Sequence, residues 1–185
     1  RILNTRKIGE TIIHDLDGQP GFSVEDSVEA KVDDKRRKAI ERHHTVTHLL
    51  HWALHEVIGD SVKQKGSYVG PDKLTFDFNH SGVSTSDLQD IQRLVNERIL
   101  ENTTVSWHTF PYADVRNNPD LMQIFGEKYG DEVRVIQIGG EPGQLNGYSL
   151  ELCGGTHTSA TGEIGGFRIL AESSVAACIR RIEAV

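Results

Sequence analysis

The sequence contains few cysteines and no long apolar run. Only two of its 185 residues are cysteine, Cys153 and Cys178, so a disulfide framework is not expected and a reducing, cytoplasmic environment is predicted. No apolar stretch approaches the roughly 20 residues that span a bilayer, and the N-terminal residues lack the charged and then apolar pattern of a signal peptide. A disulfide-rich secreted protein and a membrane-bound protein are therefore excluded, and either thiol is available as a ligand.

Positive charge is also in short supply. The formal net charge is −7 at pH 7, whereas proteins that bind nucleic acid on their own usually carry net positive charge to displace counterions from phosphates. The composition argues against a freestanding nucleic-acid binder and against DNA as a partner, although it allows a local basic patch. The sequence also opens at Arg1 without a methionine, which suggests a piece of a longer chain.

The pattern of apolar residues predicts an α+β fold. A basic, helix-prone stretch begins near residue 33 and ends near Gly59, and residues 86–102 also have helical spacing. Leu74, Phe76 and Phe78 alternate as in a half-buried strand. Other strands are expected over residues 10–16, 27–32, 104–110, 132–139, 148–152, 166–173 and 176–184, with a short helix over 120–130. Few regular βαβ alternations occur, so we expect a mixed or antiparallel sheet with packed helices and a boundary near residue 36.

The stretch "ERHHTVTHLLHWALHE" places four histidines on one side of the predicted helix: His44, His48, His51 and His55. Side chains four residues apart on a helix can converge on one ion, and both pairs, His44 with His48 and His51 with His55, satisfy that spacing. A zinc-protease motif is excluded because Gly59 stands where its second histidine would be required. Each histidine taken singly is also compatible with an ordinary solvated or hydrogen-bonded role.

A second group of candidate ligands lies in "LELCGGTH". Cys153 and His157 are four apart but separated by two glycines, which predicts a tight loop whose backbone freedom lets the thiolate and imidazole point at one centre. Taken alone, this pattern is a weak signal, and a buried cysteine with a surface histidine in a glycine-rich turn is the more common arrangement. Combined with a histidine pair it favours a metal site, and cysteine with histidine favours zinc over calcium or magnesium.

Several motifs together resemble the editing domain of alanyl-tRNA synthetases. They occur in the family's order and cover nearly the whole chain: "HTVTHLLHWAL" (44–54), "VKQKGSYVGPDKLTFDFNH" (62–80), "FGEKYGDEVRV" (125–135), "LCGGTH" (152–157), "TGEIGGF" (161–167) and "RRIEAV" (180–185). The resemblance implies one Zn²⁺ ion per chain, held in a cleft by His44, His48, Cys153 and His157. It implies that residues 1–36 are the end of a preceding small β-barrel domain and that residues 37–185 are the zinc-dependent editing domain.

The resemblance also implies a function. The domain is expected to hydrolyse the aminoacyl ester of tRNA(Ala) mischarged with serine, with glycine as a further candidate substrate. Its partners would be the acceptor end of that tRNA and the other domains of the full-length alanine–tRNA ligase. The ATP-dependent aminoacylation domain has no counterpart here, so the chain should edit tRNA without charging it. Gln64 and Thr47 match residues of the editing pocket, and Arg180 and Arg181 match a position close to the tRNA end.

Two other interpretations are compatible with these residues. One is a tRNA-binding module with a structural zinc and no hydrolytic activity, which the same four ligands would satisfy. The other is an editing domain of the threonyl-tRNA synthetase type or a freestanding editing protein, which "FGEKYGDEVRV" disfavours. The chain departs from the family pattern at Cys178, where glycine is usual, and in "RNNPDLMQI" (116–124). These departures bear on local backbone geometry, not on the expected ligands.

Overall fold

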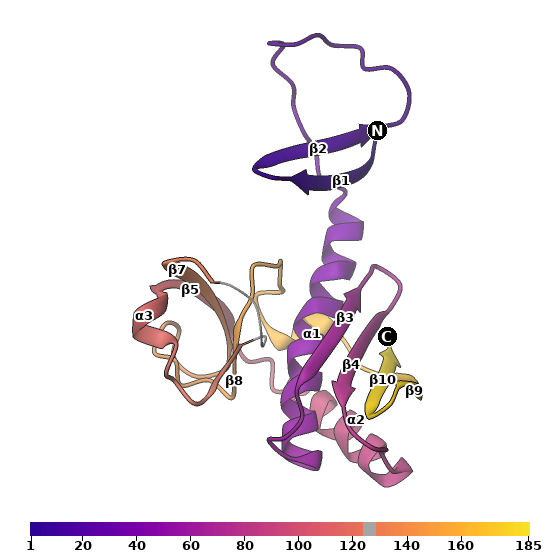
Figure 1. Cartoon of the computed structure of the whole chain (residues 1–185), viewed down its shortest axis with the longest axis vertical. Helices are drawn as coiled ribbons and strands as arrows, with labels where there is room; N and C mark the ends of the chain where they lie inside the picture. Colours follow the sequence, from indigo (N-terminus) through magenta and orange to yellow (C-terminus); the bar gives the residue numbers. More distant parts are fainter. Residues whose placement is uncertain (124–128) are drawn as a thin grey trace. The chain divides into compact units, whose positions relative to one another are not determined.

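The computed structural model describes residues 1–123 and 129–185, and these form two compact units, Arg1–Val32 and Asp33–Val185 (Figure 1). The division lies four residues before the boundary expected near residue 36. The assignment of the first segment to a β-barrel domain stays a prediction. Among the described residues, no helix has both the length and the apolar character needed to cross a membrane.

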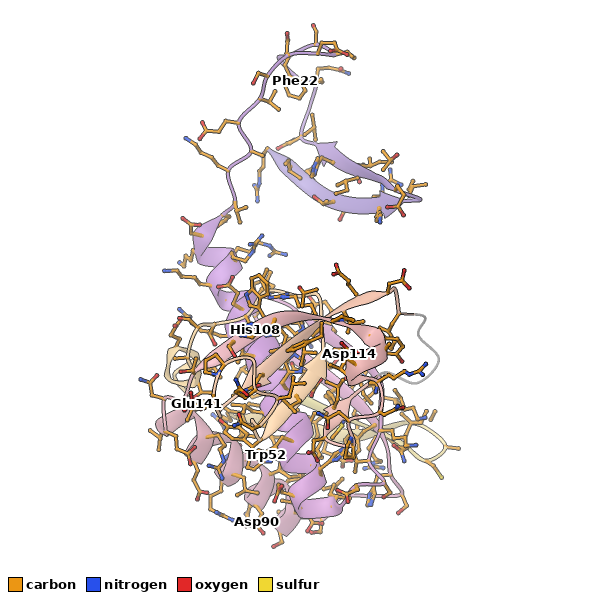
Figure 2. All side chains as sticks on the ribbon, turned by 90° about the vertical axis from the view of Figure 1, so that its left-hand side faces the viewer. Phe22, Trp52, Asp90, His108, Asp114 and Glu141 are labelled. Carbon is orange, nitrogen blue, oxygen red and sulfur yellow. The ribbon has the colours of Figure 1, made fainter. Side chains whose placement is uncertain are left out.

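The first unit is a two-stranded hairpin followed by an irregular segment. Strands β1 (Ile2–Ile8) and β2 (Thr11–Leu16) pair antiparallel through a two-residue turn, where Gly9 adopts φ 59°. Every side chain of β1 is exposed, and Phe22 extends outward from the segment that follows (Figure 2). The strand expected over residues 27–32 is wrong: these residues have no regular structure, because no neighbouring strand pairs with them within the described chain.

Two long helices of the second unit begin at side-chain caps. In α1 (Asp34–Ile58) the Asp33 carboxylate accepts a hydrogen bond from the Arg36 amide at 3.0 Å, and Gly59 ends the helix at φ 118°. In α2 (Thr85–Leu100) Ser84 and Asp87 form a reciprocal capping box. The two helices pack against each other. Both helices were predicted from the sequence, and the structure confirms them.

A four-stranded antiparallel sheet has the order β3-β4-β10-β9. Its strands are β3 (Gln64–Val69), β4 (Leu74–Asn79), β9 (Ile169–Ala176) and β10 (Ile179–Ala184). The alternation of Leu74, Phe76 and Phe78 is confirmed, since all three side chains are fully buried. Strand β3 was not expected, because its lysine and glycine give little strand propensity and it forms through pairing with β4.

A second sheet has the order β5-β7-β8-β6. It consists of β5 (Val105–Pro111), β7 (Glu132–Ile138), β8 (Ser149–Leu152) and the short β6 (Leu121–Met122), which pairs parallel with β8 while the other pairs are antiparallel. A short helix, α3 (Tyr112–Val115), follows β5, and a 3-10 turn, η1 (Thr161–Ile164), lies between β8 and β9. The helix expected over 120–130 is wrong where it is described, because Leu121 pairs with Leu150 instead; residues 124–128 lie outside the described residues.

The main hydrophobic core joins α1 to both sheets and to α2. Leu49 and Leu50 of α1, Phe76 of β4, Ile91 of α2 and Ile136 of β7 belong to one buried cluster. Val133 and Val135 point to the opposite face of their sheet and join a smaller second cluster. Helix α1 is therefore packed along much of its length, which fixes the direction of its histidines. The expected α+β class, with antiparallel and mixed sheets, is confirmed.

Candidate metal centre

Four side chains from two distant segments meet at one point of the second unit. His44 and His48 lie on α1, while Cys153 directly follows β8 and His157 lies in the loop before η1. Their candidate ligand atoms are all within 4.8 Å of one another. The Cys153 Sγ atom lies 3.4 Å from His44 Nε2 and 3.5 Å from His157 Nε2. The structure thus brings together the four predicted ligands, and this cluster could hold a metal ion.

Gly154 and Gly155 lie in the loop from Cys153 to His157, called the ligand loop here, and they have different roles. Neither Gly154 nor Gly155 adopts a positive φ, so the loop does not depend on left-handed backbone at these positions. A Cβ atom at Gly155 would lie 2.0 Å from His44 Cε1, whereas a Cβ at Gly154 would meet nothing within 4 Å. Gly155 is therefore required by the close approach of the His44 ring. This corrects the sequence interpretation, which attributed both glycines to backbone freedom.

A buried carboxylate supports one of the candidate ligands. Glu151 of β8 places Oε2 at 2.6 Å from His48 Nδ1 and Oε1 at 3.0 Å from His51 Nδ1. Burial by itself would lower the pKa of His48, but the facing Glu151 carboxylate outweighs it and raises that pKa to about 10. Burial would raise the pKa of Glu151, yet the two histidines hold it well below its usual range. The His48 Nε2 atom is buried with no hydrogen-bond partner in the described chain, and it could bind a metal ion that displaces its proton.

Sequence reasoning missed Glu151. A single acidic residue in a strand usually indicates a solvent-exposed face, and "YSLEL" offers nothing to the contrary. The available signal was its position two residues before Cys153, which places it on the same strand end as a candidate ligand.

Cys153 and His157 have the protonation states that a metal ligand needs. Burial would raise the pKa of the Cys153 thiol, but the contacts with His157 and His44 lower it to about 3. Burial lowers the pKa of His157 to about 4, against the opposing effect of Cys153. At neutral pH the pair is therefore a thiolate and a neutral imidazole. The Thr45 hydroxyl lies 3.3 Å from His157 Nδ1 and accepts a hydrogen bond from the Thr158 amide at 3.1 Å, which fixes the loop against α1.

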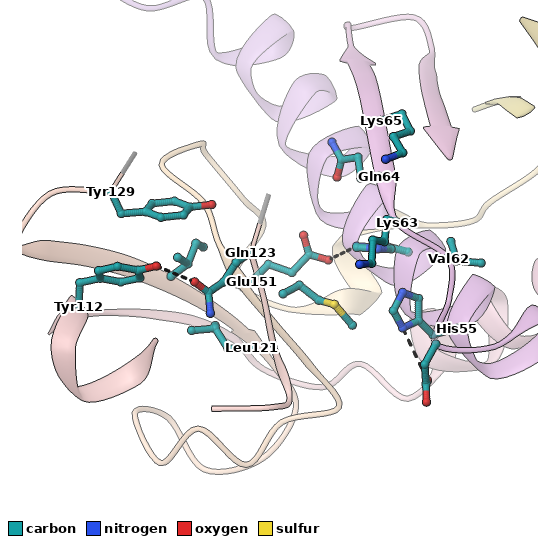
Figure 3. Close-up of a pocket in the computed structure, with 14 residues that line it drawn as sticks. His55, Val62, Lys63, Gln64, Lys65, Tyr112, Leu121, Gln123, Tyr129 and Glu151 are labelled. Carbon is teal, nitrogen blue, oxygen red and sulfur yellow. Dashed lines mark hydrogen bonds and ion pairs between the residues drawn. The ribbon is translucent and has the colours of Figure 1, made fainter. Parts of the chain in front are cut away.

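The second histidine pair of α1 lies outside this cluster. The His51 ring packs 5.2 Å from Phe76, and His55 Nδ1 lies 3.9 Å from a carboxylate oxygen of Asp60. Burial, together with the charge of His51, lowers the pKa of His55. His51, His55 and Glu151 line a cavity of about 530 Å³ that also contains Gln64 (Figure 3). This pair faces a cavity and a carboxylate instead of a thiolate.

The remaining predicted site residues have other partners. Gln64 begins β3, lines the same cavity and donates from Nε2 to Ser67 Oγ at 3.1 Å. Thr47 is buried, and its hydroxyl donates to the His43 carbonyl at 2.7 Å. Their predicted roles in substrate recognition are not decided by these contacts.

Both arginines of β10 are paired with carboxylates of neighbouring strands. Arg180 forms an ion pair with Glu172 of β9, and Arg181 donates from Nε and Nη2 to Asp77 of β4 at 2.6 and 2.7 Å. The turn that precedes them contains Cys178 at φ 54°, a conformation that favours glycine and agrees with the usual residue of the resembled family.

Known proteins resemble this chain over part or all of its length. Residues 133–183, which include Cys153 and His157, match the family described as "Threonyl and Alanyl tRNA synthetase second additional domain". The chain is 56% identical over 155 residues to the alanine–tRNA ligase of Methylacidiphilum infernorum, an alignment that covers 83% of the chain and 16% of that relative. It is 45% identical to the alanine–tRNA ligase of Akkermansia muciniphila, over 100% of the chain and 20% of the relative. The corresponding enzyme of Vesicomyosocius okutanii is 47% identical over 98% of the chain and 20% of its own length.

Residues 133–183, which contribute Cys153 and His157 to the cluster, are thus similar to the tRNA synthetase second additional domain. Over most or all of its length the chain is similar to part of the alanine–tRNA ligases. The chain spans about one fifth of the length of the curated relatives it matches.

Proposed function

We propose that His44, His48, Cys153 and His157 bind one zinc ion. The donor set of three imidazoles and one thiolate is typical of zinc. A tetrahedral zinc with nitrogen ligands at 2.0–2.1 Å and sulfur at 2.3 Å separates a nitrogen from the sulfur by about 3.5 Å. The separations of 3.4 and 3.5 Å from Cys153 Sγ to the two histidine Nε2 atoms agree with this value. The donor set and these two separations therefore support zinc as the bound metal.

The function that this site supports best is hydrolysis of the ester in a mischarged tRNA(Ala), in the cytoplasm and as part of an alanine–tRNA ligase. The observation that carries it is the zinc-type cluster together with a cavity of about 530 Å³ that is lined by Glu151, the carboxylate that contacts His48. An aminoacylation site for alanine cannot strongly reject an amino acid of similar size, because such differences are worth only about 1–3 kcal/mol. A second, hydrolytic site would correct these errors by removing serine from the tRNA, with glycine as a further candidate substrate.

The side chains around the cluster would have separate roles in metal binding and substrate recognition. A zinc ion bound there supplies Lewis acidity, which polarises an ester carbonyl and lowers the pKa of water. Glu151 Oε2 lies 2.6 Å from His48 Nδ1, which would favour a proton on Nδ1 and leave Nε2 for the ion. Gln64 supplies an amide to the cavity, where it would pair with the seryl hydroxyl; alanine would leave that amide unpaired. Thr47 is a second candidate for recognition, from its place on α1 next to His48.

Contacts with the tRNA would come from several parts of the chain and from other domains. Arg180 and Arg181 are candidates for the acceptor end, and their present carboxylate partners would have to share them with phosphate. Residues 1–36 and the other domains of a full-length synthetase would provide further contacts. With a net charge of −7, the chain alone should bind the tRNA body weakly and with little dependence on salt.

A structural zinc module without hydrolytic activity is the second candidate. It is favoured by the number of protein ligands, because a four-ligand zinc site is usually closed and structural. Release of serine from Ser-tRNA(Ala) separates the two. The zinc-loaded chain should release serine faster than it releases alanine from Ala-tRNA(Ala), and the Gln64→Ala variant should lose this discrimination. A rate equal to that of spontaneous hydrolysis would leave the structural module as the function.

Metal analysis tests the ligand assignment separately. The purified chain should contain about one zinc, and a Cys153→Ala, His157→Ala double variant should contain almost none. Full zinc occupancy in that variant would rule out the assignment.

A further inference from the structure

Trp107 is an exposed aromatic residue on the edge strand of the second sheet. It lies on β5, which has a neighbour on one side only, and its side chain is 58% exposed. Two residues earlier, Val105 belongs to the main core, and Ile136, the cross-strand partner of Trp107, belongs to it as well. Trp107 therefore lies on the core-facing side of the sheet, at the point where the core no longer covers it. The indole ring of Trp107 is open to a ligand.

Arg134 provides a positive charge directly beside the indole. Its Cζ atom lies 4.6 Å from the centroid of the Trp107 ring. Within residues 1–123 and 129–185 it forms no ion pair, so its charge is not neutralised by a carboxylate. It is held in place instead by a hydrogen bond from Nη1 to the Gly155 carbonyl.

Another aromatic and arginine group in the same unit shows what a purely structural arrangement looks like. Arg98 lies 5.0 Å from the ring centroids of both Trp52 and Tyr148, so two rings cover it, and Glu101 neutralises its charge. Among residues 1–123 and 129–185, no second ring covers Arg134 and no carboxylate forms an ion pair with it. Trp107 and Arg134 therefore leave one aromatic surface and one cation available.

This pair adjoins the metal cluster. A cavity of about 150 Å³ is lined by Trp107 and Arg134 together with His157, Thr158 and Ser159. The Cys153 amide also donates to the Arg134 carbonyl at 3.1 Å, so a ligand residue and Arg134 are joined through the backbone. A molecule that touches Trp107 would thus extend directly to the ligand loop.

We propose that Trp107 and Arg134 bind the terminal nucleotide of a single-stranded RNA 3′ end, with the base stacked on the indole and the adjacent phosphate near the guanidinium. Every nucleobase has a flat face that stacks on an aromatic ring, and the phosphate complements the unpaired cation. The inference rests on the proposed function, because an acceptor end that delivers its ester to the cluster must place its last nucleotide beside it.

The test uses the zinc-loaded chain and the uncharged trinucleotide CCA, which contains no ester to cleave. Binding is followed by quenching of tryptophan fluorescence, and the two tryptophans are distinguished with Trp52→Phe and Trp107→Phe variants. Quenching should persist in Trp52→Phe and disappear in Trp107→Phe. By a separate measurement such as calorimetry, Trp107→Ala should weaken binding by roughly 5- to 150-fold, the range expected for the loss of one stacked base. Adenosine monophosphate should compete with the trinucleotide, and ribose 5-phosphate should not.

Several outcomes would overturn the inference. These are unchanged affinity in a Trp107→Ala variant that keeps its zinc, quenching that arises from Trp52 alone, and failure of the wild-type chain to bind CCA. Arg134→Gln should weaken binding and reduce its salt dependence; an unchanged salt dependence would count against the phosphate contact. Serine release is measured separately. If it persists while Trp107→Ala binds CCA normally, only this inference fails, and if Trp107-dependent binding occurs without serine release, only the proposed function fails.

Discussion

The two histidine pairs of α1 have the same spacing and the same helix, yet they face different groups. His44 and His48 meet the thiolate and imidazole of the loop after β8. His51 and His55 meet the Glu151 and Asp60 carboxylates and line a cavity. Only the first pair has a soft sulfur ligand within reach, so only this pair is expected to hold zinc.

The difference shows that spacing on a helix identifies candidate metal ligands. Which of them can bind a metal depends on the side chains that a second segment places opposite the helix. Glu151 connects the two pairs, because its oxygens contact one histidine from each. The second pair therefore supports the first through this carboxylate. Four tests of that division follow, from the largest expected effect to the smallest.

Replacing each pair by alanine is the most direct test. The His44→Ala, His48→Ala variant should lose nearly all of its zinc, because two of the four ligands are removed. The His51→Ala, His55→Ala variant should keep about one zinc per chain, although it should be less stable because Glu151 loses a buried partner. Zinc content by mass spectrometry of the native protein distinguishes them. Equal losses in both variants would refute the proposed division.

Gly155→Ala tests how tightly the first pair is packed against its loop. The added Cβ would lie 2.0 Å from His44 Cε1, so the ring must move by roughly 1 Å or more, well beyond the 0.2 Å tolerance of a metal ligand. Zinc affinity should fall about as far as it would if the His44 ligand were removed. Gly154→Ala is the matched control and should bind zinc normally, since its Cβ meets nothing within 4 Å. Competition with a chelator measures both, and normal affinity in Gly155→Ala would contradict the prediction.

Glu151→Gln tests the link between the pairs. Losing the carboxylate that orients a ligand histidine typically weakens metal binding by about 10- to 100-fold. Glu151→Asp should recover part of that affinity, whereas Asp90→Asn, which removes a surface carboxylate paired with Arg93, should have no effect. The visible spectrum of the cobalt-substituted chain should also change in Glu151→Gln. An unchanged affinity and spectrum would show that Glu151 only fills space.

Thr45→Val should produce the smallest effect. The substitution removes the hydroxyl that contacts His157 and leaves the buried Thr158 amide without its acceptor, at a cost of about 1–3 kcal/mol in unfolding free energy. Zinc affinity should fall by less than in Glu151→Gln, because the ring of His157 keeps its contact with Cys153. Thermal unfolding and chelator competition test this, with Thr45→Ser as the conservative variant that should behave normally.

Much of the fold could be predicted from the sequence because its strongest patterns are local. The alternation in "LTFDFN", the capped helices and the valine- and isoleucine-rich β7 each determine their own element. Strand β3, and the strand at Leu121 where a helix was expected, could not be predicted, because pairing with another strand decides both. The strand expected over residues 27–32 had the composition of a strand but no partner in the described chain.

In the site, too, local patterns could be predicted and long-range contacts could not. The four candidate ligands could be named from motif spacing and family resemblance, and the structure brings them together. Glu151 and Arg134 could not be found in this way, because their roles depend on contacts with residues up to about 100 positions away in the chain. The role of Gly155 was also hidden, since it depends on a ring from α1.

The unbroken course of α1 has a consequence for which changes this domain can accept during evolution. One helix carries both histidine pairs from Asp34 to Ile58, and each added or deleted residue would turn everything after it by about 100° around the helix axis. A deletion between His48 and His51 would therefore separate Glu151 from one of its two histidines, while many substitutions at the same place would not. Variation in this segment should be limited in length more strictly than in composition.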